Sequence, residues 1–229
     1  GTNIASGSAI IIDTTAPTVI SFTSTTADGS YKSAGTVNIT ATVSETIVSG
    51  NTITVTLDTS DNVTLTAAAN GTTLVGTYTV SSGDTSSDLN VSSFSIGTVT
   101  DSAGNAMTST TVPATNIATG SAIVIDTTAP TVSSVAITSA TGTSPHNVGD
   151  IISVTSSFNE NVTVTGSPTL TLKVETTGRT AMYSSGSGGT SLVFAYTIIA
   201  GDNDDNNGIS IDMNALALNG GTIRDTASN

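Results

Sequence analysis

The chain has 229 residues, with 4 Lys and Arg against 17 Asp and Glu, which gives a formal net charge of −13. This length suits one large domain or two domains of about 100–115 residues. The scarcity of basic side chains excludes a nucleic-acid-binding surface and disfavours contact with an anionic membrane. The chain has no cysteine, which excludes disulfides, thiolate metal sites and cysteine nucleophiles. It also lacks a run of about 18 apolar residues, so we expect no membrane insertion.

A near-identical internal repeat sets the expected organisation. Residues 3–19 (NIASGSAIIIDTTAPTV) and 116–132 (NIATGSAIVIDTTAPTV) match at 15 of 17 positions, at an offset of 113. A repeat of this length predicts a tandem array of equivalent units. Its phase makes residues 1–13 the last strand of a preceding repeat or a donor strand. It then predicts one sandwich over 14–126 and a second over 127–229.

Short alternating runs separated by turn residues follow in chain order. Apolar residues recur at every second position in 37–43, 52–57 and 74–80, and again in 169–172 and 192–198. Period two with one apolar face predicts half-buried antiparallel strands, and clusters of Gly, Asn, Asp and Ser predict the turns. About seven such strands per 100 residues is typical of an immunoglobulin-like sandwich. We therefore expect an all-β fold of two tandem immunoglobulin-like Greek-key β-sandwiches.

Two further expectations concern the rest of the chain. The only helix that the pattern allows is a single turn at 214–218. By the phase of the repeat, the first copy closes with a strand at about 112–125, and the second copy lacks this strand.

Two motifs carry a family resemblance. The sequence DTTAPT stands at 13–18 and again at 126–131, and DSAGN stands between them at 101–105. This combination resembles the bacterial immunoglobulin-like repeats of large adhesins and S-layer-like cell-surface proteins, and the resemblance covers almost the whole chain. It implies an extracellular location at the cell surface and a non-catalytic role in adhesion as a stalk or spacer. It is specific for a class of repeat and implies no particular adhesion target.

The acidic residues near these motifs are candidate calcium ligands, because calcium takes six to eight oxygen ligands in proteins. In related adhesin repeats an aspartate of the linker holds calcium together with carboxylates of neighbouring loops. The resemblance therefore implies a calcium site that stiffens the array. The alternative is that the linker aspartate only caps a turn before Pro130. The candidate ligands, including two glutamates at equivalent repeat positions, are Asp126, Asp101, Asp13, Asp225, Glu45 and Glu160.

A second acidic cluster lies in the sequence GDNDDNNG at 201–208. Its oxygen donors Asp202, Asp204 and Asp205 are candidate metal ligands, although the spacing and terminal Glu of an EF-hand are missing. A solvated hairpin turn is the alternative interpretation. A third cluster, at 58–62, is predicted to be only a turn.

The chain is predicted not to be an enzyme. Its one histidine, His146, lies in a loop-like segment, and no Gly-x-Ser-x-Gly nucleophile elbow occurs. Glycoside hydrolysis needs two facing carboxylates, and the sequence offers no defensible pair. A remaining alternative is an accessory module of an extracellular enzyme whose catalytic residues lie elsewhere.

The phase of the repeat allows two interpretations of the first residues. They are either an arbitrary slice of a longer repetitive protein or a donated strand. In the second case residues 3–12, with the donor strand Ser8, Ala9, Ile10, Ile11 and Ile12, complete the second copy of a neighbour and give a head-to-tail filament. The expected partners are therefore neighbouring repeats of the same protein or identical subunits.

Overall fold

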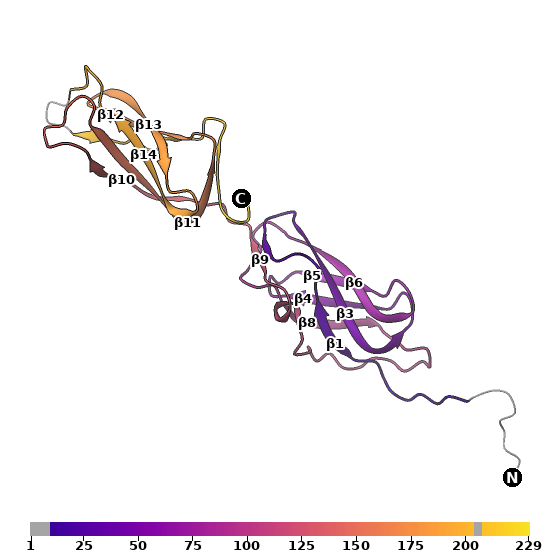
Figure 1. The fold of residues 1–229 in the computed structure, drawn as a ribbon. Coiled ribbons are helices and arrows are strands. Elements are labelled where there is room, and N and C mark those ends of the chain that lie inside the picture. The colour runs from indigo at the N-terminus through magenta and orange to yellow at the C-terminus, as the bar shows by residue number, and fades with distance from the viewer. Residues whose placement is uncertain (1–9, 204–207) are drawn as a thin grey trace, which may run out of the picture. The chain divides into compact units, whose positions relative to one another are not determined.

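The structure, a computed structural model, describes residues 10–203 and 208–229. The chain divides into two compact units, Gly1–Thr127 and Thr128–Asn229, called unit 1 and unit 2 below (Figure 1). Each unit is built from curled β-sheets with a sandwich-like architecture, which confirms the all-β prediction. The one helical element in the described part of the chain is the 3₁₀ turn η1 (Ile117–Thr119). Among these residues no helix has the length and apolarity needed to cross a membrane.

Unit 1 is organised around one large sheet and one small sheet. The large sheet has the order β1-β3-β6-β5-β4-β8, and the small sheet has the order β2-β9-β7. The strands are β1 (Val19–Thr23), β2 (Gly29–Tyr31), β3 (Thr36–Ile47), β4 (Thr52–Leu57), β5 (Asn62–Thr66), β6 (Gly71–Thr79), β7 (Thr85–Ser86), β8 (Val91–Thr98) and β9 (Ile123–Asp126).

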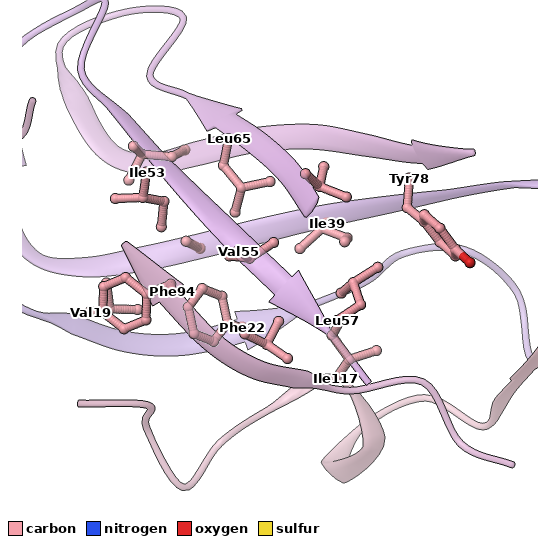
Figure 2. Packing of buried hydrophobic residues seen from close by; sticks show 14 of the residues in the cluster. Val19, Phe22, Ile39, Ile53, Val55, Leu57, Leu65, Tyr78, Phe94 and Ile117 are labelled. Atoms are coloured by element: carbon pink, nitrogen blue, oxygen red, sulfur yellow. The ribbon is translucent and has the colours of Figure 1, made fainter. Parts of the chain in front are cut away.

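The alternation seen in the sequence builds the core of unit 1. In β4 the residues Ile53, Val55 and Leu57 are buried, while the intervening threonines are half-buried. Figure 2 shows these three side chains on one face of β4, beside Phe22 and Phe94. The two phenyl rings meet edge to face, with centroids 5.6 Å apart, a geometry that the ring quadrupoles favour. The period-two pattern therefore specifies which face of each strand enters the core.

The segment that closes unit 1 runs from Thr115 to Asp126. The backbone N–H of Phe22 in β1 donates to Thr115 O (3.0 Å). The side chain of Asn116 caps η1 and also bonds the backbone of Val91 at both its N–H and its O. β9 then lies between β2, to which it is parallel, and β7, to which it is antiparallel. The predicted closing strand over 112–125 is thus too long, because capping by Asn116 turns the chain before β9 begins.

Unit 2 has a large sheet with the order β10-β11-β14-β13-β12-β15, in which β16 also pairs with β12 and β17 with β11. Leu216–Ala217 is a strand, so the single helical turn predicted at 214–218 is wrong. The strands are β10 (Val132–Ala140), β11 (Ile151–Thr165), β12 (Thr169–Val174), β13 (Thr177–Ser185), β14 (Gly189–Thr197), β15 (Ile209–Ser210), β16 (Leu216–Ala217) and β17 (Thr222–Arg224).

The two units share strand registers but differ in how much core they bury. Val37 pairs with Tyr78 in unit 1 as Ile152 pairs with Tyr196 in unit 2. Of the described residues, 24 form the buried cluster of unit 1 and 11 that of unit 2. The first strand shows the contrast most clearly. Phe22 of β1 is 0% exposed, whereas Val135, the corresponding residue of β10, is 38% exposed.

Candidate metal site

Three carboxylates converge at one end of unit 1. They belong to Asp13, which precedes β1, to Glu45 near the end of β3, and to Asp101, which follows β8. One oxygen from each lies within 4.8 Å of the others. The structure thus brings together three of the six residues predicted as calcium ligands, from segments 32 and 56 residues apart in the sequence.

Asp13 is exposed and is held from two sides. Its Oδ1 accepts a hydrogen bond from the backbone N–H of Thr15 (3.0 Å). Its backbone carbonyl accepts one from Nδ2 of Asn105 (3.2 Å). The first bond is, at the equivalent position of the repeat, the kind of turn-capping interaction that is the alternative to metal binding for Asp126. It occupies one carboxylate oxygen and still leaves lone pairs for a cation.

Glu45 lies near the end of β3, beyond the residues of β3 that pair with β1. The N–H of Ser44 donates to Thr18 O (2.9 Å), and Ile47 forms an isolated bridge with Asp101. These contacts fix the backbone on both sides of Glu45. Its Oε1 is fully buried and has no hydrogen-bond partner. A buried carboxylate oxygen that accepts no hydrogen bond raises the free energy of the folded state. A cation bound beside Glu45 Oε1 would supply the electropositive partner that this atom lacks.

Asp101 is the most fully hydrogen-bonded member of the cluster and is only 3% exposed. Its Oδ1 accepts the backbone N–H of Asn105, and its Oδ2 accepts the Asn105 side-chain amide, both at 2.8 Å. Burial opposes ionisation of this carboxyl, but these bonds and those from the N–H groups of Gly104 and Ala103 outweigh it and lower its pKa. Asp101 therefore stays ionised in mildly acidic solution.

The same neighbours act on Glu45 in the opposite direction. Loss of solvent around Glu45, followed by the negative charges of Asp13 and Asp101, raises its pKa. At low pH a proton on Glu45 relieves the crowding of the three carboxylates. At neutral pH a cation bound among them would relieve it, and carboxylate oxygens are the ligands that calcium prefers. The site thus offers calcium three carboxylates, and water and backbone carbonyls would complete the shell.

Asn105 was not predicted as part of the site, although it closes the DSAGN motif. It bonds both Asp101 and Asp13 and so fixes their separation. Asn229 bonds Asp225 in the same way in unit 2, with its backbone N–H and its Nδ2 each 2.9 Å from a carboxylate oxygen. The signal available in the sequence was the shared Asp-x-x-x-Asn spacing.

The other predicted calcium ligands are found in separate units. Asp126 ends β9 in unit 1 and pairs with Thr85. In unit 2, Asp225 is 4% exposed, and Glu160 Oε1 accepts a hydrogen bond from Asn159 (3.3 Å). By the sequence repeat, Asp126, Asp225 and Glu160 are equivalent to Asp13, Asp101 and Glu45, respectively.

Asp202, a candidate ligand of the second acidic cluster, has its carboxylate engaged inside unit 2. It accepts hydrogen bonds from the hydroxyl of Tyr196, from Arg179 Nε (2.6 Å) and from the N–H of Ile199 (3.0 Å). Burial opposes its ionisation, but these donors outweigh it and lower its pKa. Asp204 and Asp205 lie outside the described residues. The contacts of Asp202 are those of a structural residue that orders a turn.

His146 lies outside the strands, in the loop predicted from the sequence. Its Nδ1 is 3.0 Å from Thr141 O and 3.8 Å from Asp150 Oδ2. An adjacent carboxylate can orient a histidine, but acyl transfer also needs an activated nucleophile. The contacts of His146 supply no such group.

No protein-family model matches the chain, and no curated protein matches it.

Proposed function

We propose that this chain is a non-catalytic structural part of an extracellular bacterial surface protein, where it acts as a calcium-stiffened stalk or spacer. In this proposal the two units are tandem immunoglobulin-like Greek-key sandwiches. The support is the 113-residue repeat together with the shared strand registers of the two units. Stacked copies of one supersecondary unit suit a role in extending and spacing.

The observation that carries the calcium part is the carboxylate cluster of Asp13, Glu45 and Asp101. Its oxygens lie within 4.8 Å of one another, and Glu45 Oε1 is buried without a donor. Residues 1–127 contain nine acidic residues and one basic residue, Lys32, so basic side chains offer little neutralisation there. By the sequence repeat alone, the proposal extends to Asp126, Glu160 and Asp225.

The test is thermal unfolding of the full chain with and without calcium. Binding at about 100 times the dissociation constant stabilises the folded state by about 2.7 kcal/mol. That corresponds to a rise of about 10 °C in the melting temperature of the unit that holds the ion. We expect this shift for the unaltered chain between EDTA and millimolar calcium.

The matched variants are Glu45→Gln and Asp28→Asn. Both remove one negative charge from unit 1, but only the first changes the cluster. The exposed Asp28 accepts the N–H of Ala122 (2.8 Å), a bond that the amide oxygen of Asn can keep. We expect Glu45→Gln to abolish the calcium-dependent shift and Asp28→Asn to retain it. Equal shifts in both variants would show that calcium acts elsewhere, and no shift in the unaltered chain would refute the calcium proposal.

A further inference from the structure

Unit 2 contains a cavity of about 320 Å³ whose apolar walls correspond to residues that are buried in unit 1. The correspondence follows from the strand registers. Val174 pairs with Ile209 as Leu57 pairs with Val91. Four apolar positions of the wall are therefore matched in unit 1 by residues at most 2% exposed. The pairs are Ile152 with Val37, Val174 with Leu57, Ile198 with Val80, and Ile209 with Val91.

The remaining walls of the cavity identify what fills the same space in unit 1. Asp202 corresponds to Asp84, because each accepts the hydroxyl of the equivalent tyrosine, so Asn203 corresponds to Thr85. Similarly, Gly149 N–H donates to Ile198 O as Ala34 N–H donates to Val80 O. Counting back from these residues, His146 corresponds to Tyr31. In unit 1 Tyr31 and Thr85 are the strand neighbours of β9 on either side.

The cavity of unit 2 therefore lies where β9 lies in unit 1. In β9 the side chains of Ile123 and Ile125 are 0% and 2% exposed. A strand with isoleucine at alternate positions fills this space in unit 1, and the apolar walls of the unit 2 cavity are suited to the same filling.

A second cavity of unit 2, of about 500 Å³, is lined in part by Val132, Val135, Leu170 and Leu216. Val135 corresponds to Phe22, since Val135 pairs with Ser156 as Phe22 pairs with Ala41. Phe22 is the residue whose N–H donates to Thr115 O at the start of the closing segment. Both cavities thus follow the course that residues 115–126 take in unit 1.

The first described residues of this chain carry the matching strand. Ile10, Ile11, Ile12 and Asp13 align with β9 at the 113-residue offset. The three isoleucines are 75%, 86% and 83% exposed, which is unusual for consecutive large apolar side chains. Further upstream the sequence match continues to Asn3 and Ile4, which lie outside the described residues.

We propose that the open side of unit 2 binds the segment Ile10–Asp13 of a second copy of this chain as a donated strand. Ile10 and Ile12 take the positions of Ile123 and Ile125, and the strand pairs with 144–146 on one side and with Asn203, the counterpart of Thr85, on the other. Each chain then donates one strand and accepts one, so association runs head to tail and produces an open filament.

Pro145 in the accepting edge is compatible with this pairing. In unit 1 the N–H of Gly29 donates to Ala122 O, and strand backbones direct alternate residues to the same neighbour. Ser30, the residue that corresponds to Pro145, therefore directs its N–H away from β9. A proline, which has no N–H, removes no bond to the donated strand at this position.

The test is cross-linking of the full chain, which has no native cysteine. Ile11 and Pro145 correspond to Val124 and Ser30, which are paired in unit 1. We expect the double variant Ile11→Cys, Pro145→Cys to form a ladder of covalent multimers on oxidation in EDTA. The control is Ile11→Cys, Ser60→Cys, whose second site is an exposed turn of unit 1. A ladder no stronger than the control, or a cross-linked monomer, would overturn the proposal.

A second measurement keeps the proposal testable if the cysteine variants fold poorly. In sedimentation equilibrium in EDTA, the average mass of the unaltered chain should rise with concentration. Ile10→Asp, Ile12→Asp should weaken association about 100-fold or more, because both charges would be buried. Ile11→Asp, on the opposite face of the strand, should weaken it much less. A chain that stays monomeric at millimolar concentration would overturn the proposal, and neither experiment depends on calcium.

Discussion

At the residue scale, one pair of equivalent positions differs in backbone strain. Ala34 has φ +67°, and its counterpart Gly149 has φ +95°. The left-handed region costs an L-residue about 1–2 kcal/mol and costs glycine little. Unit 1 therefore carries a strained alanine where unit 2 has the residue that suits the turn.

We predict that Ala34→Gly stabilises unit 1 by about 1 kcal/mol and that Gly149→Ala destabilises unit 2 by a similar amount. Native-state amide hydrogen exchange measures both, because it reports each unit separately. Ala34 is exposed, and a Cβ added at Gly149 would meet no atom within 4 Å, so neither change alters packing. A loss of protection in unit 1 of Ala34→Gly would contradict this account of the strain.

Glu45 leads to a prediction about pH. Its pKa is raised in the folded chain, so between its ordinary and its raised value the folded state binds more protons than the unfolded state. The stability of unit 1 in EDTA should therefore fall as pH rises above about 4.5 through the raised pKa. Glu45→Gln should remove this slope and melt higher than the unaltered chain in EDTA at pH 7.

Calcium should reverse this dependence of the stability of unit 1 on pH, because the ion binds the deprotonated carboxylate of Glu45 and competes with protons. Titration calorimetry at two pH values would show weaker calcium binding at the lower one. Calcium affinity that is constant across the titration of Glu45 would separate this residue from the site.

At the element scale, both units anchor the strand before a turn with a tyrosine and an aspartate. Tyr78 at the end of β6 donates its hydroxyl to Asp84, 2.5 Å away, and Tyr196 of β14 donates to Asp202. Burial and then this hydrogen bond raise the pKa of both tyrosines. The aspartates differ, because Asp202 also accepts Arg179 from β13.

We predict that Tyr78→Phe destabilises unit 1 by about 1.5–3 kcal/mol, the usual value of a hydrogen bond to a charged group. Tyr196→Phe should cost unit 2 less, because Arg179 still neutralises Asp202. Denaturant unfolding of the two variants, each compared with the unaltered chain, gives both free energies. A larger loss for Tyr196→Phe would mean that Arg179 does not support the carboxylate.

These elements also show what could be predicted from the sequence. The period-two pattern places Ile53, Val55 and Leu57 on the buried face of β4, because alternation depends only on local spacing. The family resemblance and the repeat together predicted Asp13, Glu45 and Asp101 as candidate calcium ligands. The pattern could not show that Arg179 binds Asp202, since that contact joins β13 to the turn that follows β14. The period-two pattern also did not identify Asn105, because a side chain that hydrogen-bonds two candidate ligands produces no periodic signal in the sequence.

At the scale of the whole molecule, the two units differ in how much apolar core they bury. The buried core of unit 1 includes Phe22 of its first strand, whereas β10 of unit 2 is exposed along almost its whole length. Less apolar burial means a smaller stabilising term against a chain entropy of similar size. Unit 2 without a donated strand should therefore be the less stable unit, and the unaltered chain at low concentration should unfold in two steps with unit 2 first.

The last prediction links that stability to the donated strand. A synthetic peptide of residues 3–13, added to dilute chain in EDTA, should raise the lower melting temperature by about 10 °C at 100 times its dissociation constant. The upper transition should not move, because β9 already fills the equivalent space in unit 1. A peptide with Ile10→Asp and Ile12→Asp has the same length and should have no effect, since its charges would enter apolar walls. If both peptides shift both transitions equally, the peptide acts without occupying the cavity of unit 2. A shift of the lower transition alone would also account for the exposed isoleucines, because residues that are exposed in one molecule would fill the cavity of unit 2 in the next.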